Sequence, residues 1–236
     1  MPDIKSVRAS LEWLYKDSDM GREMQRMWEE NSTSPRLSDP LLVNPKECYA
    51  QASPKLFFVG IVTDGWGRST KNVDKWLEHS GYPDAVDQSI VKKASFWTCV
   101  KKLHEMLGVD FDGGCGVWSN LIRMDDDGNK PKRDLAKEMI DRFPLLREEV
   151  RICAPDLVVF LTGNKRDDLI RRTFGADTKI VRLISTKIGK EDLALVHLGL
   201  GIRAYRTHHP RYMYSLGTER KDGILEAIRD DFMRHR

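Results

Sequence analysis

The sequence predicts an α/β sandwich with a short, mainly parallel central sheet, and three observations support this fold class. Short apolar runs alternate along the chain with segments of helical periodicity, as in βαβ units. The runs are continuous, which is typical of strands that are buried on both faces of a parallel sheet. The 236 residues are 40% hydrophobic and 32% charged, the balance of a globular chain with one substantial core.

The pattern of residues 1–54 predicts a helical arm followed by a proline-containing loop, and we expect both to pack on the main domain. Apolar residues recur at steps of three and four from Ile4 to about Glu30, the period of an amphipathic helix, with a break near residues 17–21. The prolines that follow each fix φ and remove a backbone donor, so a connecting loop is expected there. We expect residues 55–236 to form the α/β domain, and the whole chain to be one structural domain.

Within the α/β domain, runs of Val, Ile, Leu and Phe predict strands, and helical spacing of apolar residues predicts the segments between them. The predicted strands are residues 55–62, 116–123, 156–162, 180–184 and 193–198. The predicted helices are residues 73–79, 86–107, 135–153 with a break at Pro144, 167–174 and 221–233. Functional residues in such a sheet lie in loops that follow the carboxyl ends of the strands.

Composition and charge limit the classes of partner. The 39 Lys and Arg residues against 36 Asp and Glu leave a net charge of +3, so any nucleic acid must be held by a local patch. No stretch approaches the ~18 apolar residues of a membrane-spanning helix, and the N-terminus lacks a continuous apolar signal segment. We therefore expect a cytoplasmic protein with no membrane partner.

The residues that commonly bind metals are dispersed. Cys48, Cys99, Cys115 and Cys153 lie far apart without CxxC spacing, which predicts free and mostly buried thiols in a reducing compartment. The acidic run at residues 125–127 is interpreted as a solvated turn, because three adjacent carboxylates cannot all face one ion from a tight turn. We expect neither a metal nor a cofactor.

Three of the loops after predicted strands contain candidate functional residues. The first contains Gly60, Asp64 and Trp66 in a glycine-rich turn, which either approaches a ligand closely or caps the core. Asn120 follows the second strand, and its amide either reads a base or ties two loops together. Residues 206–214 combine two histidines with arginines and tyrosines, a combination that fits a nucleic-acid contact, although paired histidines in a loop are more often structural.

The loop at residues 162–167 allows a different chemistry. Its Asn164-Lys165-Arg166-Asp167 segment resembles the guanine-reading element of small GTPases, and a capped helix N-terminus is the alternative interpretation. A GTPase also needs the Lys and the Ser or Thr of a phosphate-binding loop, and Trp66 and Gly67 stand at those positions. Nucleotide binding through Asn164 and Asp167 is therefore a lesser alternative.

Four short segments come in a fixed order along the chain, and they are Gly60-Ile61, Ser119-Asn120-Leu121, Leu161-Thr162-Gly163 and His209-Pro210. Together they resemble the uracil-DNA glycosylase superfamily, a group of DNA-repair hydrolases. The first loop is closest to the single-strand-selective branch, whose pattern Gly-Met-Asn-Pro-Gly-Pro-aromatic-Gly is matched at Gly60, Trp66 and Gly67. The resemblance spans about residues 55–232 and implies a three-layer α/β/α sandwich with a short, mainly parallel central sheet.

The resemblance also implies a function, which is the extrusion and hydrolytic excision of a modified base such as uracil from DNA. Asn120 would bind the edge of the base, while Gly60 and Trp66 would line its pocket. His209 would stabilise the negative charge that develops on the departing base.

The chain departs from the family at the residue that holds the attacking water. Val62 stands at that position and can neither orient nor deprotonate water, which leaves Asp64 as the candidate for this role. The departure motivates an alternative function, a catalytically inactive protein that binds nucleic acid or a nucleobase on the same fold.

Single- or double-stranded DNA is the expected partner, and the residues expected to contact it lie near the C-terminus. These are Arg206, Arg211, Tyr212, Met213 and Arg220. The arginines would pair with phosphates, and the side chains after His-Pro would fill the gap left by a flipped nucleotide. A protein interface formed by the N-terminal arm is a further alternative, although Trp13 and Trp28 are expected to face the core.

Overall fold

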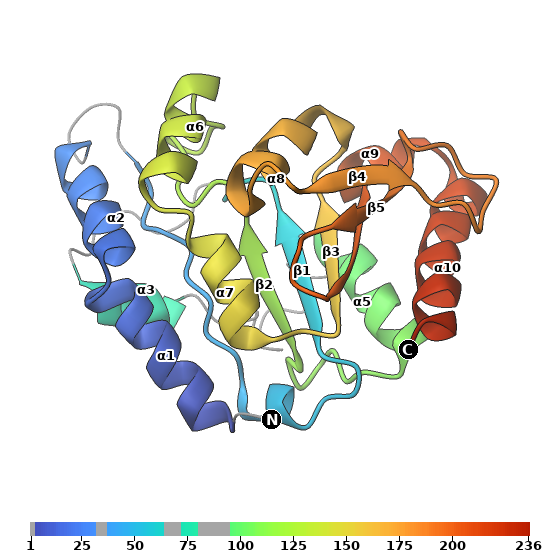
Figure 1. Cartoon of the computed structure of the whole chain (residues 1–236), viewed down its shortest axis with the longest axis horizontal. Helices are drawn as coiled ribbons and strands as arrows, with labels where there is room; N and C mark the ends of the chain where they lie inside the picture. Colours follow the sequence, from blue (N-terminus) through green and yellow to red (C-terminus); the bar gives the residue numbers. More distant parts are fainter. Residues whose placement is uncertain (1–2, 32–36, 64–71, 80–94) are drawn as a thin grey trace.

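The computed structural model describes residues 3–31, 37–63, 72–79 and 95–236. They form an α/β fold in which helices flank a mixed, mostly parallel sheet of six strands (Figure 1). This arrangement confirms the predicted α/β class and the mainly parallel character of the sheet.

The strand order of the sheet is β2-β1-β3-β6-β5-β4. The strands are β1 (Leu56–Gly60), β2 (Gly116–Asn120), β3 (Leu157–Leu161), β4 (Lys179–Arg182), β5 (Leu193–His197) and β6 (Arg203–Thr207). Strands β2, β1, β3 and β6 are parallel to one another, whereas β5 and β4 pair antiparallel. Gly60 aligns with Asn120, and Leu161 aligns with Thr207, so the carboxyl ends of the parallel strands meet at one edge.

The described helices match most of the predicted segments. They are α1 (Ile4–Lys16), α2 (Asp19–Glu30), α3 (Val73–His79), α5 (Ser95–Leu107), α6 (Arg133–Arg142), α7 (Leu145–Cys153), α8 (Asp167–Phe174), α9 (Pro210–Ser215) and α10 (Thr218–Arg234). The short 3-10 helices are η1 (Glu47–Ala50) and η3 (Asn164–Arg166). The predicted break at Pro144 separates α6 from α7, and the predicted helical residues 86–94 lie outside the described residues.

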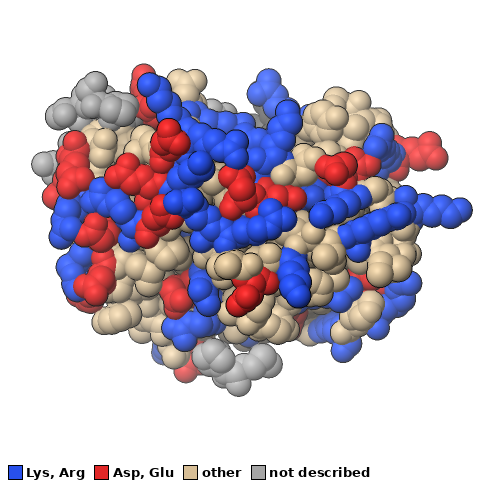
Figure 2. Space-filling model, turned by 45° about the horizontal axis from the view of Figure 1, so that its top comes forward, with Lys and Arg blue, Asp and Glu red and all other residues tan. Residues whose placement is uncertain are grey.

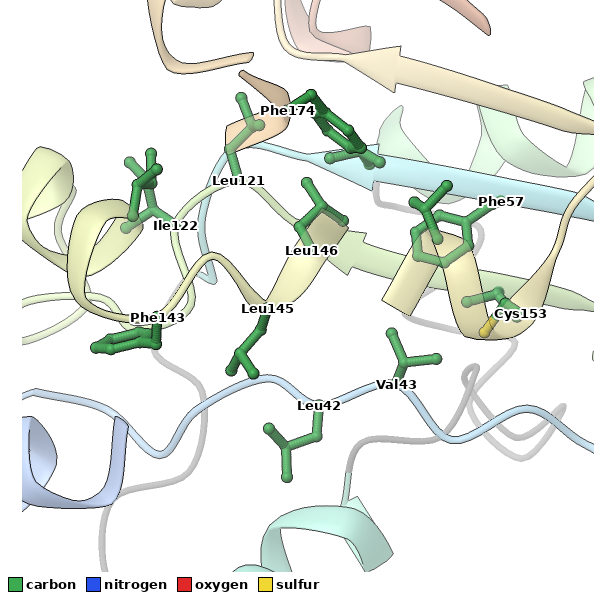
Figure 3. Packing of buried hydrophobic residues seen from close by; sticks show 14 of the residues in the cluster. Leu42, Val43, Phe57, Leu121, Ile122, Phe143, Leu145, Leu146, Cys153 and Phe174 are labelled. Carbon is green, nitrogen blue, oxygen red and sulfur yellow. The ribbon is translucent and has the colours of Figure 1, made fainter. Parts of the chain in front are cut away.

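Two clusters of buried hydrophobic side chains lie on opposite faces of the sheet. Alternate residues of a strand point to opposite faces, so Phe57 packs with the cluster under α1, α2, α6, α7 and α8, whereas Phe58 packs under α5, α9 and α10. Figure 3 shows the first cluster, where Phe57 meets Leu146 of α7 and Val43 of the segment that follows the arm. Helices therefore cover both faces of the sheet.

The N-terminal arm, helices α1 and α2, is joined to the core by a buried polar network. Tyr15 of α1 donates a hydrogen bond to Glu149 at 2.7 Å, and its hydroxyl accepts one from the Val43 amide at 2.9 Å. Glu149 forms a buried ion pair with Arg123, and Ser119 of β2 donates to Glu149 at 3.1 Å. Burial, with the nearby Glu149 charge, raises the pKa of Tyr15 well above its ordinary value. The arm is thus connected to β2 and α7.

Two elements, β6 and α9, are absent from the sequence-based expectations. In β6 the segment Arg203-Ala-Tyr-Arg206-Thr207 contains two arginines, so it lacks the apolar run that marks the other strands. Helix α9 has only 6 residues, which is too few for apolar residues to show a helical period in the sequence. Both elements carry residues that were expected to lie in a loop.

The cysteines depart from the expectation of free thiols. Cys48 and Cys115 form a disulfide with Cα atoms 5.2 Å apart, while Cys99 and Cys153 are free and buried. The two paired positions are separated by 67 residues, and nothing in their sequence spacing relates them. In the described ranges, no helix combines the length and the apolar character needed to cross a membrane.

Two further expectations are corrected by burial. Trp13 is 59% exposed on α1, whereas Trp28 is buried and packs against Trp76 with ring centroids 5.5 Å apart. Asp125 is fully buried instead of solvated, because its carboxylate accepts hydrogen bonds from Thr63 Oγ1 at 2.8 Å and from the Gly128 amide at 2.7 Å.

Candidate functional site

A cleft of about 680 Å³ opens at the carboxyl ends of the parallel strands. Its walls come from the residues that follow β1, β3 and β6, from the segment before β5, and from α9. Loops at this edge of a parallel sheet are the usual position of ligand sites. The predicted loops at residues 162–167 and 206–214 both contribute to the cleft.

His209 lies in the cleft as the N-cap residue of α9. Its Nδ1 accepts a hydrogen bond from the Arg211 amide at 3.3 Å, so the proton of the neutral ring is on Nε2. Burial, together with the positive charges of Lys130, Arg166 and Arg211, lowers the pKa of His209 to about 4. The imidazole is therefore neutral at pH 7 and presents an Nε2–H donor.

Its neighbour His208 is held by a carboxylate. Nε2 of His208 lies 2.7 Å from Asp192 Oδ1, and Arg220 donates to the other oxygen of the same carboxylate. Burial would raise the pKa of Asp192, but the hydrogen bonds from Arg220 and His208 outweigh burial and hold the pKa below its ordinary value. Arg220, which was expected to contact DNA, is exposed and bound to Asp192.

Arg206 is fully buried, so it is not the phosphate-binding residue that the sequence indicated. Its guanidinium pairs with Asp167 at 2.9 Å and donates to the carbonyl oxygens of Glu191 and Lys190 at 2.8 and 2.9 Å. These bonds fix residues 190–192, which form one wall of the cleft, and Thr207 adds a bond to the Asp192 carbonyl at 2.8 Å.

The same ion pair bears on nucleotide binding through the third loop. Asp167 is occupied by Arg206, and Asn164 donates its amide hydrogen to Glu191. Neither side chain is arranged to bind a guanine base, so the structure gives the GTPase-like alternative no support.

The residues after His209 separate into exposed and buried positions. Arg211 and Tyr212 are exposed and line the cleft, and the Tyr212 ring lies 4.8 Å from that of His208. Met213 is fully buried in the cluster beneath α9 and α10. A side chain in that position cannot enter a duplex, which corrects the expectation for Met213.

Gly60 and Asn120 lie side by side at the ends of β1 and β2. A Cβ at residue 60 would collide with the side-chain amide of Asn120, so the close approach requires glycine. With the amide oriented to satisfy both groups, Asn120 accepts a hydrogen bond from the Thr63 amide and donates to the Ser119 carbonyl. Asn120 is 1% exposed, and this geometry fits the structural alternative, in which it ties two loops together.

The two remaining candidates of the first loop, Asp64 and Trp66, lie outside the described residues. Val62 is half-buried and packs against the core beneath the N-terminal arm. Its side chain therefore contributes an apolar contact at the position where the sequence resemblance led us to expect a water-holding residue.

Positive charge gathers around the cleft. Lys165, Arg166 and Arg211, here called the rim cations, line the cleft and have no carboxylate partner within the described part of the chain. Figure 2 shows Lys and Arg side chains gathered across the middle of the face that it presents, with acidic groups more frequent toward one side. The rim cations make the cleft suitable for an anionic ligand.

Sequence reasoning missed Lys130, Glu191 and Asp192 as residues of the cleft. Asp192 directly precedes a predicted strand, and Lys130 follows the acidic turn, so neither position stands after a predicted strand. Among the described residues, no group of three or more His, Cys, Asp or Glu side chains could hold a metal ion.

Comparison with protein-family models gives no match, and no curated protein matches the chain. The fold and the site therefore define only a class: an α/β protein with a basic cleft at the carboxyl ends of its parallel strands.

Proposed function

We propose that the chain is a DNA glycosylase-like hydrolase of the uracil-DNA glycosylase kind, built on a three-layer α/β/α sandwich. The observation that carries the proposal is His209, a neutral imidazole whose Nε2–H donor has no hydrogen-bond partner among the described residues and which lies in a cleft with the rim cations. The parallel order β2-β1-β3-β6 supports it, because the four sequence segments that resemble the family come at the ends of these strands.

In the proposed reaction, the base leaves with the electron pair of the bond between C1′ and the base nitrogen. The Nε2–H of His209 donates a hydrogen bond to the negative charge that develops on the base, a contribution that is larger in a desolvated site. The oxygen of water then bonds to C1′, and the proton from water ends on the released base. Asp64 remains the candidate that orients the water.

Phosphate groups are the proposed partners of the rim cations. A nucleotide drawn into the cleft brings its flanking phosphates toward Arg166 and Arg211, where no carboxylate within the described residues competes for the guanidinium groups. Unstacking a nucleotide costs a few kcal/mol, and these charges would offset part of that cost.

The test is an excision assay on single- and double-stranded oligonucleotides that carry uracil, hypoxanthine or another modified base. Wild type should generate abasic sites, and His209→Ala should slow excision by about 100- to 1000-fold, as loss of a charge-stabilising donor does. His235→Ala is the matched control, because His235 is exposed near the C-terminus. The absence of abasic product, or a His209→Ala rate equal to wild type, would refute the enzymatic proposal.

A second candidate function is binding of nucleic acid without hydrolysis, and Val62 favours it. Its apolar side chain packs against the core where a water-holding residue is expected. The same oligonucleotides separate the two functions: salt-dependent binding with no abasic product in any of them supports the binding protein.

A further inference from the structure

Four exposed cations lie on the hairpin formed by β4, β5 and the segment between them, residues 179–197, which we call the basic hairpin. They are Lys179, Arg182, Lys187 and Lys190. Within the described part of the chain, none of them forms an ion pair with a carboxylate. Strand β4 is the last strand of the sheet, so one of its edges faces outward.

The carboxylates of the same hairpin are occupied by other groups. Glu191 accepts a hydrogen bond from Asn164, and Asp192 is held by His208 and Arg220. They are directed to the cleft wall and do not neutralise the hairpin lysines. The positive charges of Arg182, Lys187 and Lys190 therefore stay without a carboxylate partner among the described residues, which suits the binding of a polyanion.

The basic hairpin continues one wall of the cleft. Its residues 190–192 contribute Glu191 and Asp192 to the cleft, and the buried Arg206 donates to the Lys190 and Glu191 carbonyls. Thr207 adds its bond to the Asp192 carbonyl. These bonds fix the base of the hairpin relative to the cleft before any ligand binds, which lowers the entropy cost of a contact there.

We propose that the basic hairpin binds the sugar-phosphate backbone of the strand that flanks the nucleotide in the cleft. This inference rests on the proposed function for the identity of the polymer. The new element of the inference is a second contact, outside the cleft. A nucleic-acid strand that leaves the cleft along residues 190–192 would meet Lys190, Lys187 and Arg182. The contact is with phosphates, so it is independent of base sequence.

Three double variants, each of which removes two positive charges, test the proposal. They are Arg182→Gln with Lys187→Gln on the hairpin, Lys165→Gln with Arg211→Gln in the cleft, and Lys5→Gln with Arg147→Gln as the control, whose side chains are exposed. Binding is measured for undamaged single-stranded DNA of about 5 and about 25 nucleotides, lengths at the lower end of and well above the usual range of single-strand site sizes. Titrations at several salt concentrations give the salt dependence.

The hairpin variant should weaken binding of the long oligonucleotide and leave the short one unchanged. Each lost phosphate contact lowers the salt dependence of single-strand binding by about 0.7, so two lost contacts lower it by about 1.4. Between about 50 and 200 mM salt, wild-type affinity should therefore fall about sevenfold more than that of the hairpin variant. The cleft variant should weaken binding of both oligonucleotides, and the control variant should bind both as wild type does.

Two results would overturn the inference, and they differ in what else they imply. If the hairpin variant matches the control on the long oligonucleotide while the cleft variant binds weakly, the hairpin contact is wrong and the proposed function stands. If wild type binds neither oligonucleotide, the proposed function fails together with the hairpin contact.

Discussion

Arginine side chains near the N-terminal arm and those at the rim of the cleft differ in their surroundings. Arg142 of α6 pairs with Glu23 and Glu30 of α2, and the buried Arg123 pairs with Glu149. At the rim, Arg166 and Arg211 have no carboxylate partner in the described part of the chain. The charges of the first region therefore join one element to another, whereas those of the second are left for a ligand.

The largest expected effect is on the buried network of the first region. Glu149→Ala leaves the Arg123 guanidinium buried without its partner, and this should lower the free energy of unfolding by about 3–5 kcal/mol, as measured by urea denaturation. Glu47→Ala, which removes the exposed pair with Arg8, is the control and should change stability by no more than about 1 kcal/mol. Equal effects of the two variants would contradict the distinct role given to the buried pair.

The disulfide gives the next effect. Cys48→Ser combined with Cys115→Ser opens a loop of 67 residues and should lower the free energy of unfolding by about 2–4 kcal/mol. A reductant should destabilise wild type by a similar amount and leave the double variant unchanged. Cys115 directly precedes β2, at the end of the sheet opposite the cleft, so oligonucleotide binding should not change. Loss of binding would show that the two regions are coupled.

Acid should destabilise the protein through His104. Burial lowers the pKa of His104 from 6.5 to about 4, so between these values the unfolded chain binds a proton that the folded chain does not. Stability due to this group is complete above pH 6.5 and declines as pH falls toward 4, by about 3 kcal/mol in all. The free energy of unfolding of His104→Gln should fall less steeply than that of wild type across this window. Part of the fall that remains in the variant comes from His209, because the pKa of His209 is also about 4.

His197 is exposed, so His197→Gln is the control for that measurement. The free energy of unfolding of this variant should fall with pH in parallel with that of wild type. A His104→Gln profile that is parallel to wild type would show that His104 is protonated equally in the folded and unfolded chain.

The smallest effect on stability is expected at the rim. Lys165→Gln with Arg211→Gln should change the free energy of unfolding by less than about 0.5 kcal/mol, because neither side chain pairs with a carboxylate in the described structure. Arg142→Gln, which removes the pairs with Glu23 and Glu30, should cost more, about 1 kcal/mol. The contrast between the two regions would be lost if the rim variant were the less stable one.

Elements with a regular apolar pattern were predictable, and elements that depend on distant partners were not. The ranges of α3 and α8 match the structure because their apolar residues keep a helical period. Strand β6 was missed because its Arg206 can be buried only with partners that are distant in the sequence. These partners are the Asp167 carboxylate and the carbonyl oxygens of Lys190 and Glu191. The disulfide was missed for the same reason, since its cysteines are 67 residues apart.

The candidate site was predictable only in part. His209 and Arg211 were predicted because residues 206–214 combine histidines with arginines and tyrosines and because His209-Pro210 resembles a family motif, and both residues line the cleft. Lys130 and Asp192 were missed because tertiary packing brings them there from other segments. Met213 was expected to enter DNA because it follows His-Pro in the sequence, which did not show that the segment forms α9 with Met213 on its buried side.

The contact between Gly60 and Asn120 has a consequence for related sequences. The amide of Asn120 occupies the space where a side chain at residue 60 would begin, and it also fixes the Thr63 amide. A larger residue at 60 therefore requires a smaller residue at 120, and that exchange releases the Thr63 amide. We expect the two positions to covary across homologues, with glycine at the first wherever asparagine stands at the second.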